Sequence, residues 1–121
     1  MNSKIAALAF AGVGFLSLTA SAHPVLKETV PKVDAEIKTS PSEIRLIFNE
    51  DLAPKFSGIE LKDQTGKIIQ TGSAASDAKD KKQLVIPVKA TLTPGLYTVE
   101  WHAVAEDTHR VKGSYRFMLQ P

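Results

Sequence analysis

The chain has 121 residues, no cysteine, and 15 basic against 13 acidic side chains, which gives a net charge of +2. This length is typical of one small domain with a single core. The low net charge gives no electrostatic basis for binding nucleic acid or anionic membranes, and the absence of cysteine excludes disulfides, thiolate metal sites and thiol chemistry.

Residues 1–22 have the pattern of a secretory signal peptide. Lys4 supplies the positive start, an apolar run follows at Ile5–Leu18, and Ala20-Ser21-Ala22 forms a small-x-small cleavage pattern. The run is shorter than the roughly 20 residues of a membrane-spanning helix, although an uncleaved anchor is the alternative. We therefore predict export and a mature domain at residues 23–121, whose net charge is +1 because Lys4 is the only charged side chain removed.

Cleavage after Ala22 would create an N-terminus that can bind a metal ion. The new α-amine of His23 titrates near about pH 7.7 to 8.0, so it loses its proton readily at neutral pH and can chelate together with ring Nδ1. Pro24 has no N–H and Val25 is not a ligand, which excludes the square-planar site built from backbone amides and a third-position histidine. The other interpretation is that His23 is simply the residue that follows the signal peptide.

The mature sequence predicts an all-β domain without a convincing helix. Turn residues separate about seven short strands, a pattern that indicates a two-sheet sandwich. The polar segment Ser73–Lys82 predicts a surface loop, and the apolar residues Tyr97 and Trp101 are expected in the core. The predicted strands are Val25–Thr29, Glu43–Asn49, Gly58–Lys62, Lys67–Thr71, Gln83–Val88, Leu96–Val104 and Gly113–Leu119.

Asp107 and His109 lie two residues apart, at the end of a predicted strand or in the loop after it. In extended backbone, residues i and i+2 point to the same face about 6.6 Å apart, so the two side chains could form half of a metal site. The alternative is a solvated acidic turn with a surface histidine. Glu100 and His102 have the same spacing, but we expect His102 on the outer sheet surface, paired with Glu100.

Taken together, these features resemble the CopC/PcoC family of periplasmic copper-resistance proteins, and the chain is most similar to the small, single-domain, methionine-poor members. The resemblance depends on the order and spacing of short motifs over nearly the whole mature sequence. These motifs are His23, Leu26-Lys27, Pro31, Ile44–Glu50, Phe56-Ser57-Gly58, Lys82–Pro87, Pro94–Trp101, Asp107-Thr108-His109 and Gly113–Phe117.

The resemblance implies a Greek-key sandwich, cupredoxin-like or immunoglobulin-like, that binds one Cu(II) ion very tightly. The family ligands are the N-terminal histidine, through its amine and ring, and the two side chains of an aspartate-x-histidine motif. They match His23, Asp107 and His109 here. A family glutamate in a Phe-Ser-Glu pattern matches Glu50, although Asn49 replaces the serine, and the resemblance implies that Glu50 orients the amine or a bound water.

Two departures from the family pattern bear on the metal. Val25 stands where many members have a second histidine, and the segment Ser73–Lys82 has no methionine where Cu(I)-binding members have a methionine-rich loop. Met118 is the only methionine of the mature chain, and Cu(I) prefers such soft ligands. We therefore expect one Cu(II) site and no Cu(I) site.

Three nitrogens and one carboxylate oxygen suit tetragonal Cu(II), which also leads the divalent affinity order. We expect a periplasmic, monomeric Cu(II)-binding protein of copper homeostasis or resistance, with no enzymatic activity. It would sequester copper or pass it to an inner-membrane transporter or efflux component. Two alternatives stay open: a mono-copper oxidase built on an N-terminal histidine brace, and a plain exported interaction domain in which His23 and Asp107 bind nothing.

Overall fold

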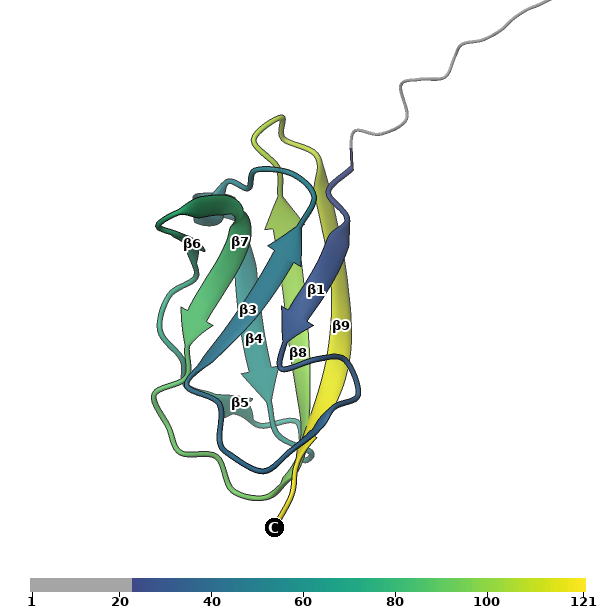
Figure 1. Ribbon diagram of the computed structural model, residues 1–121, viewed down its shortest axis with the longest axis vertical. Coiled ribbons are helices and arrows are strands. Elements are labelled where there is room, and N and C mark those ends of the chain that lie inside the picture. The colour runs from purple at the N-terminus through teal and green to yellow at the C-terminus, as the bar shows by residue number, and fades with distance from the viewer. Residues whose placement is uncertain (1–22) are drawn as a thin grey trace, which may run out of the picture.

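The computed structural model describes residues 23–121, which fold into a β-sandwich of two sheets (Figure 1). The strands are β1 (Leu26–Val30), β2 (Glu36–Ile37), β3 (Glu43–Phe48), β4 (Gly58–Lys62), β5 (Ile68–Ile69), β6 (Ala75–Asp77), β7 (Asp80–Pro87), β8 (Gly95–Val104) and β9 (Arg110–Leu119). One sheet has the order β1-β3-β7-β6, and the other has the order β2-β9-β8-β4-β5. The predicted all-β sandwich is confirmed, whereas the signal peptide predicted at residues 1–22 lies outside the described residues.

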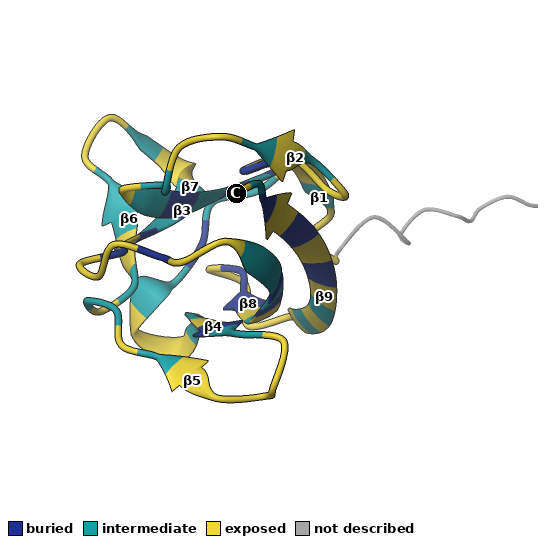
Figure 2. Cartoon of the chain, turned by 90° about the horizontal axis from the view of Figure 1, so that it is seen from below, coloured by how far each residue is buried: buried dark blue, intermediate teal, exposed yellow. Residues whose placement is uncertain are grey.

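Alternating side chains form the core between the two sheets. In β3, Ile44 and Leu46 are fully buried and Phe48 is nearly so, as the apolar alternation predicts. Figure 2 shows the same alternation as buried and exposed bands along β9, where Tyr115 and Phe117 face inward. Burial on one face of each strand therefore sets the register of both sheets.

Trp101 is half-buried at the edge of this core. Its ring meets Phe48 edge to face, with centroids 5.4 Å apart. The opposite residue on β9 is Gly113, and a Cβ there would come within 2.7 Å of the indole. The glycine therefore leaves the space that the indole occupies.

The prediction of a surface loop at Ser73–Lys82 is wrong, because β6 and the start of β7 form a hairpin in this segment. Asp77 explains the hairpin: its Oδ1 accepts the N–H of Lys79 (2.8 Å), and its Oδ2 accepts a hydrogen bond from Arg45 Nη1 on β3 (2.7 Å). Ser76 in this segment lies opposite the buried Leu84 of β7, and its hydroxyl is buried as well. Pairing with β7 makes this polar segment a strand, and the contact of Asp77 with Arg45 joins it to β3.

Two further differences concern strand ends. The two-residue strand β2 was not predicted, because it is too short to show a periodicity, and it pairs in parallel with the end of β9. In addition, β9 begins at Arg110 instead of Gly113, so β8 and β9 pair continuously from Gly95–Leu119 to Val104–Arg110.

Within residues 23–121, the helical element η2 (Pro54–Phe56) is a single 3-10 turn, and no helix there has the length and apolar character to cross a membrane.

The core predicts a clear difference between two apolar truncations. Leu46→Ala should lower the free energy of unfolding by about 2–5 kcal/mol, because Leu46 has no exposed surface and the substitution leaves a cavity. Ile68→Ala should change it by less than about 0.5 kcal/mol, because Ile68 on the short edge strand β5 is 56% exposed. Urea denaturation measures both, and equal losses would contradict the assignment of the core.

Candidate metal centre

The Asp107–His109 motif lies in the tight turn that joins β8 to β9. Two backbone hydrogen bonds close the turn: Ala105 N–H donates to the carbonyl of His109, and Thr108 N–H donates to the carbonyl of Ala105, both at 2.8 Å. Asp107 Oδ1 accepts the N–H of His109 (3.1 Å), as in an Asx turn. The same oxygen lies 3.3 Å from His109 Nδ1, so the carboxylate and the imidazole are in contact.

The turn, and not an extended strand, brings these two side chains together. Thr108 has a φ of +76°, in the left-handed region that β-branched residues rarely adopt. The expectation that Asp107 and His109 meet is confirmed, but the reason given for it, two side chains on one face of extended backbone, is wrong. The left-handed residue between them costs about 1–2 kcal/mol, and the surrounding hairpin must offset this cost.

His23 lies beside this turn although it is distant in the sequence. The rings of His23 and His109 have centroids 5.2 Å apart and are nearly perpendicular, at 83°. This proximity follows from the topology, since β1 pairs with β3 so that the chain enters the sandwich at the end where β8 turns into β9 (Figure 1). The structure therefore gathers His23, Asp107 and His109 at one end of the molecule.

These side chains remain accessible to an ion from solvent. His23 is exposed, and the side chains of His109 and Asp107 are about half-exposed, at 45% and 47%. The hydrogen bond from the backbone N–H of His109, and then the contact with its ring, lower the pKa of the Asp107 carboxyl below its usual value. The carboxylate is therefore ionised at neutral pH and offers oxygen lone pairs to a cation.

The three side chains are neighbours, but they do not yet point at a common centre. Within the part of the chain that the structure describes, no three His, Asp or Glu side chains converge closely enough to hold a metal ion. His109 directs Nδ1 at Asp107, while the ring of His23 stands edge-on to it. Because the side chains are exposed, ring rotations can bring them together. Two imidazoles and a carboxylate are a donor set suited to Cu(II) or Zn(II).

Glu50 belongs to the segment that follows β3. This segment contacts the base of the turn between β8 and β9. Leu52 pairs with Ala105, and the N–H of Ala53 donates to the carbonyl of Val104 (2.8 Å). Glu50 itself is half-buried, and no hydrogen bond or ion pair of its carboxylate is seen among residues 23–121. Its predicted role in orienting the amine or a bound water stays a prediction.

Asn49, the residue before Glu50, was missed as a functional candidate in the sequence. Its side-chain Oδ1 accepts the N–H of Val25 (2.7 Å), and its own N–H donates to the carbonyl of Val25 (3.0 Å). The contact therefore fixes the chain two residues after His23. The only signal in the sequence was the position of Asn49 beside Glu50, where the resemblance implies a serine.

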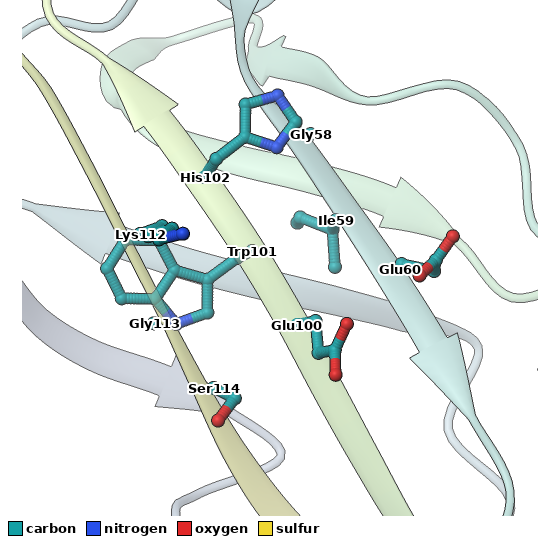
Figure 3. Close-up of a pocket in the computed structure, with 9 residues that line it drawn as sticks. All are labelled: Gly58, Ile59, Glu60, Glu100, Trp101, His102, Lys112, Gly113 and Ser114. Carbon is teal, nitrogen blue, oxygen red and sulfur yellow. The ribbon is translucent and has the colours of Figure 1, made fainter. Parts of the chain in front are cut away.

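His102 lies on the outer surface of the five-stranded sheet, as predicted. Its ring extends toward Gly58 of β4, where a Cβ would come within 2.6 Å of Cε1 (Figure 3). The predicted pairing with Glu100 is not seen, because the Glu100 carboxylate lies 3.1 Å from Lys62 Nζ. His102 lines an open hollow of about 670 Å³ over β4, β8 and β9, together with Glu60, Glu100, Lys112 and Ser114.

Comparisons with known proteins agree over most of the chain. The sequence model of the CopC domain family matches residues 26–120. Protein YobA from Escherichia coli (strain K12) is 34% identical over 114 residues, which cover 94% of this chain and 92% of that protein. Copper resistance protein C from Escherichia coli is 36% identical over 116 residues, covering 90% of this chain and 88% of that protein.

A solved structure agrees with the fold as well. The crystal structure of PcoC, a methionine-rich copper resistance protein from Escherichia coli, superimposes with a TM-score of 0.74 at 36% identity. The match covers 82% of this chain and 100% of that one.

The left-handed conformation of Thr108 predicts a stabilising substitution. Thr108→Asn should raise the free energy of unfolding by about 1 kcal/mol and the melting temperature by about 4–8 °C, because asparagine tolerates this conformation better than a β-branched residue. Thr91→Asn is the matched control, since Thr91 is exposed and is not among the residues with positive φ. Thermal unfolding measures both variants, and an equal shift in the two would contradict strain at Thr108.

Proposed function

The chain belongs to the CopC family, and from this premise we propose that it is an exported protein that binds one Cu(II) ion in copper homeostasis or resistance. The observation that carries the proposal is the contact of His23 with the Asp107–His109 turn, from opposite ends of the chain. A plain interaction domain would have no reason to gather these particular side chains, whereas a copper-binding domain requires it.

The proposed ligands are the α-amine and ring of His23, the carboxylate of Asp107 and the ring of His109. Removal of residues 1–22 would create the amine, and this step explains why the donor set is incomplete in the uncut chain. Three nitrogens and one oxygen form a set that suits Cu(II) and places it above the other divalent ions in affinity. The lowered pKa of Asp107 supports its part, because the carboxylate requires no deprotonation before it binds.

The donor types also favour Cu(II) over Cu(I). Met118 is the only methionine among residues 23–121. It lies near the end of β9, where it pairs with Leu96 at the start of β8, and so at the opposite end of the strands from the Asp107–His109 turn. The relative PcoC is methionine-rich by contrast. Reduction of the bound ion to Cu(I) would therefore lower its affinity for this site, because Cu(I) prefers soft ligands, and would promote its release.

We further propose that the protein works in the periplasm as a monomer without enzymatic activity. It would either sequester copper or pass it to an inner-membrane transporter or an efflux component. The exposed site supports transfer, since a partner can approach Asp107 and His109 directly from solvent. Copper-loaded protein supplied with ascorbate should cleave neither chitin nor cellulose, and cleavage of either polysaccharide would favour a mono-copper oxidase instead.

Alanine substitutions test the ligands. In protein that begins at His23, His23→Ala and His109→Ala should each weaken Cu(II) binding by on the order of 100-fold or more, because even indirect support of a metal ligand is worth about 10–100-fold. His102→Ala is the matched control and should change the affinity little, since His102 lies over Gly58 on the sheet surface. Competition titration against a chelator gives the affinities, and equal losses in all three variants would overturn the assignment.

The amine is tested by lengthening the chain. One extra glycine before His23 moves the α-amine by one residue, so the amine and the ring can no longer form the same chelate ring. Cu(II) binding should weaken strongly, and the electron paramagnetic resonance spectrum of the copper-loaded protein should change. An unchanged titration and spectrum would show that the amine is not a ligand.

A further inference from the structure

The first residues of the described chain form a short arm, His23–Val25, in which Pro24 is the one buried residue. The strand that follows, β1, is at the edge of its sheet, and its register with β3 shifts between Leu26 and Glu28. Thr29 is the one residue of β1 that is buried, at 6% exposure. The position of His23 therefore depends on contacts made by the arm itself.

Two features of the arm supply such contacts. Pro24 is buried between the exposed residues His23 and Val25, so it fastens the arm through packing. Because proline has no N–H, the N–H of Val25 is the first backbone donor after His23. Asn49 accepts this N–H at 2.7 Å and returns its own N–H to the Val25 carbonyl at 3.0 Å. The two hydrogen bonds form a clamp directly behind His23.

The segment that carries Asn49 also holds the other half of the site. Three residues further along, Leu52 pairs with Ala105, and the carbonyl of Asp51 accepts the N–H of Glu106 (3.1 Å). Both contacts are at the base of the turn that presents Asp107 and His109. One continuous stretch of backbone, anchored by the buried Phe48 and Leu52, therefore joins the arm to the turn.

We propose that Asn49 is a positioning residue for the copper site: through the clamp on Val25 it holds His23 beside the turn that carries Asp107 and His109. This inference rests on the proposed function. Asn49 does not touch the metal. It restricts the arm before copper binds, so the arm loses less conformational freedom on binding. Ordering an arm before binding raises affinity without adding a ligand.

The test compares three variants of protein that begins at His23. Asn49→Ala should weaken Cu(II) binding by about 3- to 10-fold, the range expected for one hydrogen bond. Its electron paramagnetic resonance spectrum should match that of the unmodified protein, because the ligands are unchanged. Asn49→Asp should bind at least as tightly as the unmodified protein, since its carboxylate can accept the same N–H.

Ser40→Ala is the matched control for the general loss of a hydrogen bond. Ser40 Oγ accepts the N–H of Leu92 (2.9 Å) beyond the start of β3, at the opposite end of that strand from Asn49. This variant should keep the copper affinity of the unmodified protein. An equal loss of affinity in Ser40→Ala and Asn49→Ala would overturn the proposal, because the effect would then be general destabilisation.

A readout without copper separates this inference from the proposed function. In the metal-free protein, amide hydrogen exchange at Val25 should be faster in Asn49→Ala than in the unmodified protein, Asn49→Asp and Ser40→Ala. Weak Cu(II) binding by the unmodified protein would reject the proposed function, and with it the copper role of the clamp. Tight binding that Asn49→Ala leaves unchanged, or an altered spectrum in that variant, would overturn only the role of Asn49.

Discussion

Two stretches from opposite ends of the chain meet at one end of the sandwich, and the candidate site depends on this meeting. The pairing of β1 with β3 brings the arm to the same end as the β8–β9 turn. The segment after β3 then pairs with the base of the turn through Leu52 and Ala105. The candidate ligands are exposed, and the core sets the strand register that makes the meeting possible.

Rigidity and accessibility are divided between different parts of the molecule. The rigid part is the sandwich itself. Its inward-facing side chains are buried, and the ten-residue strands β8 and β9 pair along their whole length. This hairpin can hold Thr108 in an unfavourable conformation that a looser loop would relax. The ligand-type side chains at its tip stay exposed, so they can reorient around an ion and release it again.

Asn49 contacts the arm at an exposed place on the surface. A hydrogen bond from a side chain to the backbone, placed outside the ligand set, restricts the arm while leaving His23 in solvent. The chain belongs to the CopC family, and its candidate site offers two imidazoles and a carboxylate, a donor set that suits Cu(II) or Zn(II).

The sequence by itself determined the fold class, the family and the residue types available as ligands. Alternation in β3 and β8 reports burial directly, and the order of the motifs is a property of the chain alone. Tertiary structure decided the rest. The strand at Ala75–Asp77 pairs with β7 and contacts Arg45 on β3 through Asp77. The approach of Asp107 to His109 depends on a turn with Thr108 in a left-handed conformation, and the clamp joins Asn49 to Val25. Periodicity shows which face of a strand is buried, but it holds no information about which distant backbone group a polar side chain will meet.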